Sequence, residues 1–159
     1  MKTLAASSGI AATLIIALAL AGAAVGRTQA TTIQLNTSMN AAQEVPKPKG
    51  SVRRAKGTFT ATVTKSGTTG TIAWRLSFSG LTGRAMSAHI HRGKRGKAGP
   101  VVVALCGPCR SGMRRSAALT PAVLTALEAG RAYVNIHTTR NPGGEIRGQI
   151  AAVPLRITP

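Results

Sequence analysis

The chain has 159 residues, of which 43% are hydrophobic and only 3% aromatic, and this length fits one ordinary domain. It carries 21 Lys and Arg against three acidic residues, Glu44, Glu128 and Glu145, and it contains no Asp, so the formal net charge is +18. So few carboxylates argue against paired acid–base catalysis and against an all-oxygen Ca²⁺ cage. Apolar residues recur in ordered patterns throughout, which argues against a disordered chain.

Residues 1–30 have the pattern of a secretory signal peptide. Lys2 supplies a short positive region, residues 10–25 form an uncharged apolar run, and small residues flank several cleavage points, including Thr28-Gln29-Ala30. The alternative, a retained membrane anchor, fits less well because the run is short and rich in Ala. No Cys lies at a cleavage point, which argues against a lipid-anchored protein. We expect an exported protein, extracellular or in the cell envelope, with no membrane span after cleavage and with a single domain over residues 31–159.

Alternation of apolar and polar residues is the dominant pattern of that domain. Successive side chains of a strand point to opposite faces, so each alternating segment predicts a strand with one buried and one solvated face. These segments are 33–39, 58–64, 71–78, 132–137 and 145–150. Residues 101–105 (VVVAL) are continuously apolar, which predicts a strand covered on both sides.

Turn residues and one helix complete the predicted fold. Residues 66–70 and 141–144 are rich in Gly and predict two hairpin connections. Thr120 as N-cap, Pro121 in the first turn, an AVLTALEA segment and Gly130 as the stop predict one short helix. Strands of this number and spacing predict a Greek-key β-sandwich or a flattened barrel, with long basic loops at 43–56 and 92–100.

Three histidines in strand-like segments are the candidate metal ligands. His89 and His91 share the outer face of one strand, and His137 lies on the outer face of another. If these strands are neighbours, three imidazoles converge, which is the ligand type that Cu or Zn prefers. Tyr133, Asn135 and Glu145 are the candidates for a supporting shell. The alternative is a polar stripe that hydrogen-bonds the Gly93–Pro100 loop onto the sheet. We expect the histidines to lie near one another, and we favour this loop-holding role over metal binding.

The segment Cys106-Gly107-Pro108-Cys109 matches the dithiol motif of thioredoxins, but its context differs. A redox dithiol of that kind needs a following helix to lower the pKa of the first thiol, and residues 110–115 show no helical pattern. In an oxidising compartment two close cysteines form a loop disulfide, which is the interpretation that we favour. The nearby Arg110, Arg114 and Arg115 would stabilise a thiolate, so the redox alternative stays open.

Basic residues gather in clusters that would attract polyanions. The predicted polyanion-binding residues are Lys94, Arg95, Lys97, Arg110, Arg114 and Arg115. Aromatic residues that could stack on bases are nearly absent, and Trp74 and Phe78 are predicted core, so nucleic acid is the least favoured partner. Anionic polymers of the cell envelope or the extracellular space are the partners expected; the alternative is a charged, soluble surface without a dedicated partner.

Several motifs in a fixed order resemble one domain family. The segment 88–102 reads AHIHxGxxGxxGPVV, the segment 130–138 reads GxxYVNIHT, and 142–149 reads PGGEIRGQ. Together with Ala42-Gln43-Glu44-Val45-Pro46, these motifs resemble the CHRD domain, named for chordin, and cover roughly residues 32–152.

The resemblance implies an immunoglobulin-like, all-β domain without established enzymatic activity. The His-x-His strand, the later His and the Gly-rich hairpin are also faintly similar to Cu/Zn superoxide dismutase, but this chain has no Asp for a zinc site and too few histidines for that enzyme. The sequence therefore predicts a secreted, non-enzymatic binding or structural CHRD-domain protein with no resident cofactor. The alternative is a Cu/Zn-binding or redox protein that uses the three histidines and the Cys pair.

Overall fold

The computed structural model describes residues 30–153, so the predicted signal peptide lies almost wholly outside the described residues. Nine strands, one 3₁₀ turn and one helix follow each other along this part of the chain. In order they are β1 Thr31–Asn40, η1 Ala41–Gln43, β2 Lys56–Ser66, β3 Thr69–Ser79, β4 Ala85–Arg92, β5 Val101–Cys106, β6 Met113–Leu119, α1 Pro121–Glu128, β7 Ala132–Thr138, β8 Ile146–Gln149 and β9 Ala151–Val153. The fold is all-β with one short helix, as the sequence predicts.

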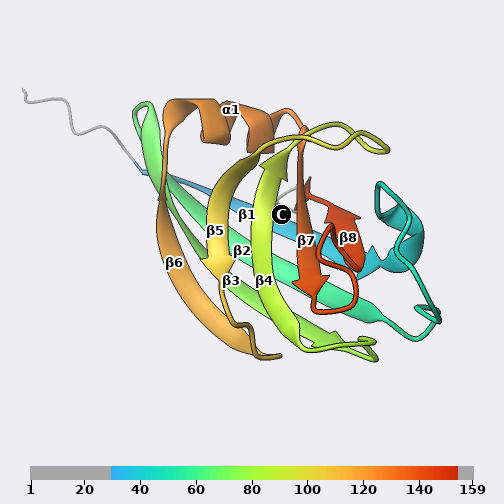
Figure 1. The fold of residues 1–159 in the computed structure, drawn as a ribbon. Coiled ribbons are helices and arrows are strands. Elements are labelled where there is room, and N and C mark those ends of the chain that lie inside the picture. Colours follow the sequence, from blue (N-terminus) through green and yellow to red (C-terminus); the bar gives the residue numbers. More distant parts are fainter. Residues whose placement is uncertain (1–29, 154–159) are drawn as a thin grey trace, which may run out of the picture.

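The strands form one antiparallel sheet in the order β5-β4-β7-β8-β1-β2-β3-β6, with β9 added beside β1. The chain builds β1, β2 and β3 as neighbours, crosses to form the β4–β5 hairpin, returns for β6, and crosses again for β7 and β8. The β8–β1 junction is narrow, because only Asn40 and Arg147 pair there. This junction lets the sheet fold over on itself into a nearly closed, flattened barrel (Figure 1).

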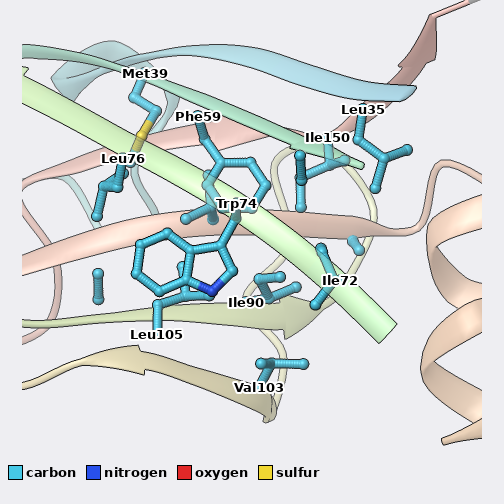
Figure 2. Packing of buried hydrophobic residues seen from close by; sticks show 14 of the residues in the cluster. Leu35, Met39, Phe59, Ile72, Trp74, Leu76, Ile90, Val103, Leu105 and Ile150 are labelled. Carbon is cyan, nitrogen blue, oxygen red and sulfur yellow. The ribbon is translucent and has the colours of Figure 1, made fainter. Parts of the chain in front are cut away.

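The barrel interior is filled by the apolar side chains that alternate along each strand. Phe59 and Trp74 lie in the middle with their rings stacked 6.4 Å apart, and Leu105 and Val103 approach from the other half of the sheet (Figure 2). Leu76 and Ile72 flank Trp74 on β3 and are completely buried. Each such large side chain contributes about 1.5–3 kcal/mol on burial, so this cluster dominates the stability of the domain.

Both predicted hairpins and the predicted helix are confirmed. The first hairpin is tighter than expected, because Ser66 pairs with Thr69 and only Gly67 and Thr68 form the turn. The second hairpin joins β7 to β8 through residues 139–145. Helix α1 covers one end of the barrel (Figure 1). Thr120 takes the N-cap position without a side-chain capping bond, and Gly130 follows the C-cap with a φ of 62°, which favours glycine.

Two expectations about solvent exposure are wrong. The 101–105 run was expected to be covered on both sides, but β5 is an edge strand in which only Val103 and Leu105 are buried, and Val101 is 50% exposed. The outer face of β7 was expected to be solvated, yet Tyr133 and Asn135 are each only 2% exposed. The loop after β4 and residues near η1 cover that face, as their bonds to Tyr133 and β8 show.

Strand β6 has no counterpart in the sequence prediction. It pairs with β3 over its whole length, from Gly70–Leu119 to Leu76–Met113. Among the described residues, no helix is long and apolar enough to cross a membrane.

Candidate metal centre

The three histidines come together because β4 and β7 are neighbours in the sheet. The antiparallel register places Ser87 opposite His137 and His89 opposite Asn135. The alternate residues of both strands, among them Ile90 and Ile136, point into the core and are fully buried. His89, His91 and His137 therefore project together from the outer face, as the sequence predicts.

The ligand atoms of the three imidazoles lie within 4.8 Å of one another. The shortest separation, 3.1 Å between His89 Nδ1 and His137 Nε2, is a hydrogen bond between the two imidazoles. Three nitrogens bound to one tetrahedral ion at about 2.0 Å are about 3.3 Å apart. The separations in this cluster, up to 4.8 Å, are therefore near those of a three-nitrogen site.

Backbone carbonyls fix which ring nitrogen of two histidines faces the cluster. His91 Nδ1 is 2.8 Å from the carbonyl oxygen of Gly99, and His137 Nδ1 is 2.8 Å from that of Pro142. A carbonyl only accepts, so both Nδ1 atoms carry the proton and donate it. Both Nε2 atoms therefore present a lone pair. This is the arrangement that orients metal-binding histidines in other proteins.

The surroundings of His89 and His137 favour their neutral imidazole forms. Burial, followed by the nearby His137 and His91, lowers the pKa of His89. Burial also lowers the pKa of His137, and the bond to Pro142 offsets this only in part. Neutral imidazole is the form that binds a metal ion.

The Nε2 atom of His91 is buried and has no hydrogen-bond partner. His91 is 8% exposed and its ring stacks on Tyr133, with centroids 4.8 Å apart and planes 9° apart. A buried lone pair without a donor is costly, typically about 1–3 kcal/mol. It is an orphaned acceptor within a group of three potential ligands, so the donor set fits Cu or Zn.

Of the three residues predicted to support the histidines, Tyr133 and Asn135 lie opposite His91 and His89 in the β4–β7 pairing. The Tyr133 ring stacks on His91, and its hydroxyl accepts a hydrogen bond from the Gly99 amide at 3.1 Å. The side chain of Asn135 also bonds to Glu44. Glu145 accepts hydrogen bonds from Thr82, Thr138 and Asn141 and so orders the β7–β8 connection.

Sequence reasoning missed Arg147, which is 1% exposed and holds the other side of Tyr133. Its guanidinium carbon lies 3.3 Å from the Tyr133 ring centroid, a cation–π contact. Its Nη2 donates to the carbonyl oxygens of Lys94 and Lys97 at 3.0 and 2.9 Å. Arg147 therefore fixes both the aromatic ring behind His91 and the loop that carries Gly99.

The other predicted site residues lie elsewhere. Cys106 and Cys109 are joined by a disulfide with an S–S distance of 2.03 Å, at the connection between β5 and β6. The six predicted polyanion-binding residues do not form one surface. Lys94, Arg95 and Lys97 are exposed on the loop after β4, at the α1 end of the barrel, and Arg110, Arg114 and Arg115 lie on the β5–β6 connection and β6 (Figure 1).

Comparison with known proteins gives one match. The chain matches the family model described as CHRD domain over residues 35–150, which includes every strand that carries the three histidines. No curated protein and no solved structure matches the chain.

Proposed function

The chain belongs to the CHRD-domain family, and from that premise we propose that it is an exported binding protein whose ligand is a single Cu or Zn ion held by His89, His91 and His137. CHRD domains are typically found in extracellular proteins. The apolar run at 10–25 and the Cys106–Cys109 disulfide both suit an oxidising compartment outside the cytoplasm.

The observation that carries this proposal is the unpartnered Nε2 atom of His91. It lies in a group with two further imidazole nitrogens, and the protonated nitrogens of His91 and His137 point away to carbonyls. One divalent ion would give His91 Nε2 the partner that it lacks. The same ion would take the place of the hydrogen bond between His89 and His137.

Binding is favoured over catalysis by the placement of the carboxylates. Glu44 and Glu145 are buried and bonded within the domain, and Glu128 pairs with Lys65 at 2.7 Å. None of the described carboxylates belongs to the histidine group, so the ion would lack a neighbouring acid–base residue.

A purely structural role is the second candidate. His91 holds the loop after β4 through Gly99, and His137 holds the β7–β8 connection through Pro142. These bonds form without any ion. A structural role predicts that His variants lose stability while the wild type binds no metal.

Calorimetric titration of untagged, metal-free protein with Cu²⁺ or Zn²⁺ separates the two candidates. We expect one equivalent to bind with a dissociation constant below about 1 μM, because three pre-oriented imidazoles are available. The double variant His89→Ala and His91→Ala should lose this binding, and Cu²⁺ bound to the wild type should show nitrogen hyperfine coupling in its electron paramagnetic resonance spectrum.

Asn36→Ala, an exposed change on β1, serves as the control and should bind like the wild type. Folding of each variant is checked by circular dichroism. Failure of the folded wild type to bind either ion, or equal binding by the double variant, would leave the structural role as the function of the cluster.

A further inference from the structure

The outer face of β1, β2, β3 and β6 is a polar surface on different strands from the histidine group. Its side chains are mostly exposed, and most of them are hydroxyls, amides and guanidiniums. The exposed residues in its centre are Gln34, Asn36, Thr60, Ala73, Arg75, Arg114 and Ser116.

The strand register arranges these side chains in two parallel rows. One row runs Asn36, Thr60, Arg75 and Arg114, and each member is paired with the next across neighbouring strands. The second row runs Gln34, Thr62, Ala73 and Ser116 in the same way. The guanidiniums therefore lie at one side of a line of hydrogen-bonding groups.

Arg75 and Arg114 are directly opposite each other, which is an unfavourable pair in an antiparallel sheet. The hydrogen bond of the Arg75 side chain is a long one, 3.5 Å from Nε to Ser77 Oγ. Within residues 30–153 the one ion pair, Lys65–Glu128, lies elsewhere. Nothing on this face neutralises the two guanidiniums, so a bound anion would remove their repulsion.

A shallow hollow of about 480 Å³ lies between the two rows. Thr60, Thr62, Arg75, Arg114 and Ser116 line it. Ala73 also lines it and has the smallest side chain of its row. The four strands span about 14 Å at the usual spacing between strands, which is room for several linked sugar rings.

The geometry points to this face as a binding site for an acidic polysaccharide. Arg75 and Arg114 would bind a uronate carboxylate, and the hydroxyl and amide side chains of both rows would bind the sugar hydroxyls. Guanidiniums bind carboxylates through paired, charge-assisted hydrogen bonds, and hydroxyl and amide side chains match the hydroxyls of a sugar. The site is independent of the histidine group and stands whether or not that group binds metal.

The test is titration of the mature chain with hexagalacturonic acid in about 50 mM NaCl, followed by calorimetry and by amide NMR shifts. The double variant Arg75→Gln and Arg114→Gln is compared with Arg53→Gln and Arg54→Gln, which removes the same charge from an exposed loop. We expect the first pair to weaken binding by about tenfold or more and the control pair by less than about threefold. The shifts of the wild type should centre on Ala73 and Ser116.

Maltohexaose, which is neutral, and sodium sulfate are the comparison probes. Weak or absent binding of both supports the site. Equal losses in the two double variants, shifts located elsewhere, or no binding by the wild type would overturn it. If sulfate binds as tightly as hexagalacturonic acid does, the proposal of a polysaccharide site is overturned, and the face is a site for simple anions. Urea unfolding shows that both double variants fold, and the Arg75 and Arg114 changes should leave the midpoint equal or higher, because they remove a like-charge pair.

Discussion

Glu145 is a carboxylate that the fold buries and keeps ionised. Burial alone would raise its pKa, but hydrogen bonds from Thr138, Thr82 and Asn141 outweigh that effect and hold the pKa below the ordinary value of 4.5. Thr138 Oγ1 lies 2.6 Å and the Thr82 amide 2.6 Å from the carboxylate. Because the folded pKa is depressed, Glu145 stabilises the fold above the unfolded pKa, and this contribution is lost as pH falls through the folded pKa.

Glu145→Gln should lower the free energy of unfolding by about 2–3 kcal/mol at pH 7, because an amide replaces one acceptor of charge-assisted bonds. The difference from the wild type should shrink below pH 4.5, as the unfolded carboxyl takes up its proton first. Urea unfolding at pH 7, 5 and 3.5 measures both effects.

Glu128→Gln is the matched control. Its partner Lys65 is 34% exposed and Glu128 is 36% exposed, so this surface pair contributes less than about 1 kcal/mol. A loss for Glu128→Gln as large as that for Glu145→Gln would contradict the assignment of Glu145 as the buried bonding centre.

The loop between β4 and β5 holds one side of the histidine group in place. The amide and carbonyl of Gly99 bond to Tyr133 and His91, respectively. The loop is also held by the Arg92 amide, which donates to the carbonyl oxygen of Pro100 at 3.0 Å. A Cβ atom at Gly99 would overlap the backbone carbonyl oxygen of Arg92, so only glycine lets the loop close over His91.

Gly99→Ala should therefore displace the loop, lower the free energy of unfolding by about 1–3 kcal/mol and weaken Cu²⁺ or Zn²⁺ binding by about tenfold or more. Urea unfolding and metal titration of the same preparation measure the two losses. Gly143→Ala is the control, because a Cβ there meets no atom within 4 Å, and it should change stability by less than about 0.5 kcal/mol. Wild-type metal affinity in folded Gly99→Ala protein would show that the loop does not position His91.

The sequence predicts those elements whose burial follows a simple period. Strands β2 and β3 alternate Thr and other polar residues with Phe59, Val63, Ile72 and Leu76, so their inner and outer faces are readable directly. Strand β6 is an edge strand in which Leu119 alone is fully buried, so its sequence MRRSAAL shows no such period.

For the candidate site, the sequence predicts the three histidines that could bind a metal but not the charged residues packed around them. Strand alternation places the three histidines on outer faces. Whether they converge depends on which strands are neighbours, and alternation does not predict that. The supporting residue Arg147 and the nearby Glu44, which lies beside Asn135, are charged, and charged residues normally indicate a solvated position. Their burial follows from long-range packing of the loops over β7 and β8, for which the local sequence carries no signal.

The excess of positive charge over the domain destabilises its folded state. The chain has 21 Lys and Arg against three acidic residues, and the described residues form one ion pair. Repulsion among exposed cations opposes the compact state, and salt screens it over a distance of about 10 Å or less above 0.1 M.

Raising NaCl from 20 to 500 mM should therefore raise the melting temperature of the metal-free protein by about 5 °C. Differential scanning calorimetry measures the shift, and sucrose at matched osmolarity separates screening from general solute effects. A melting temperature that is constant or lower in high salt would mean that the charges are spaced too widely to repel one another.

The histidine group can form only after the domain has folded. His89 and His137 are 48 positions apart, and they meet only when β4 and β7 have paired. An exported chain that crosses a membrane unfolded carries its ligands separately, and separated imidazoles bind an ion far more weakly than a formed site does. Under the proposed export, any ion held by all three is acquired after translocation and folding, from the metal supply outside the cell. The metal content of the purified protein would then record the environment into which it was released.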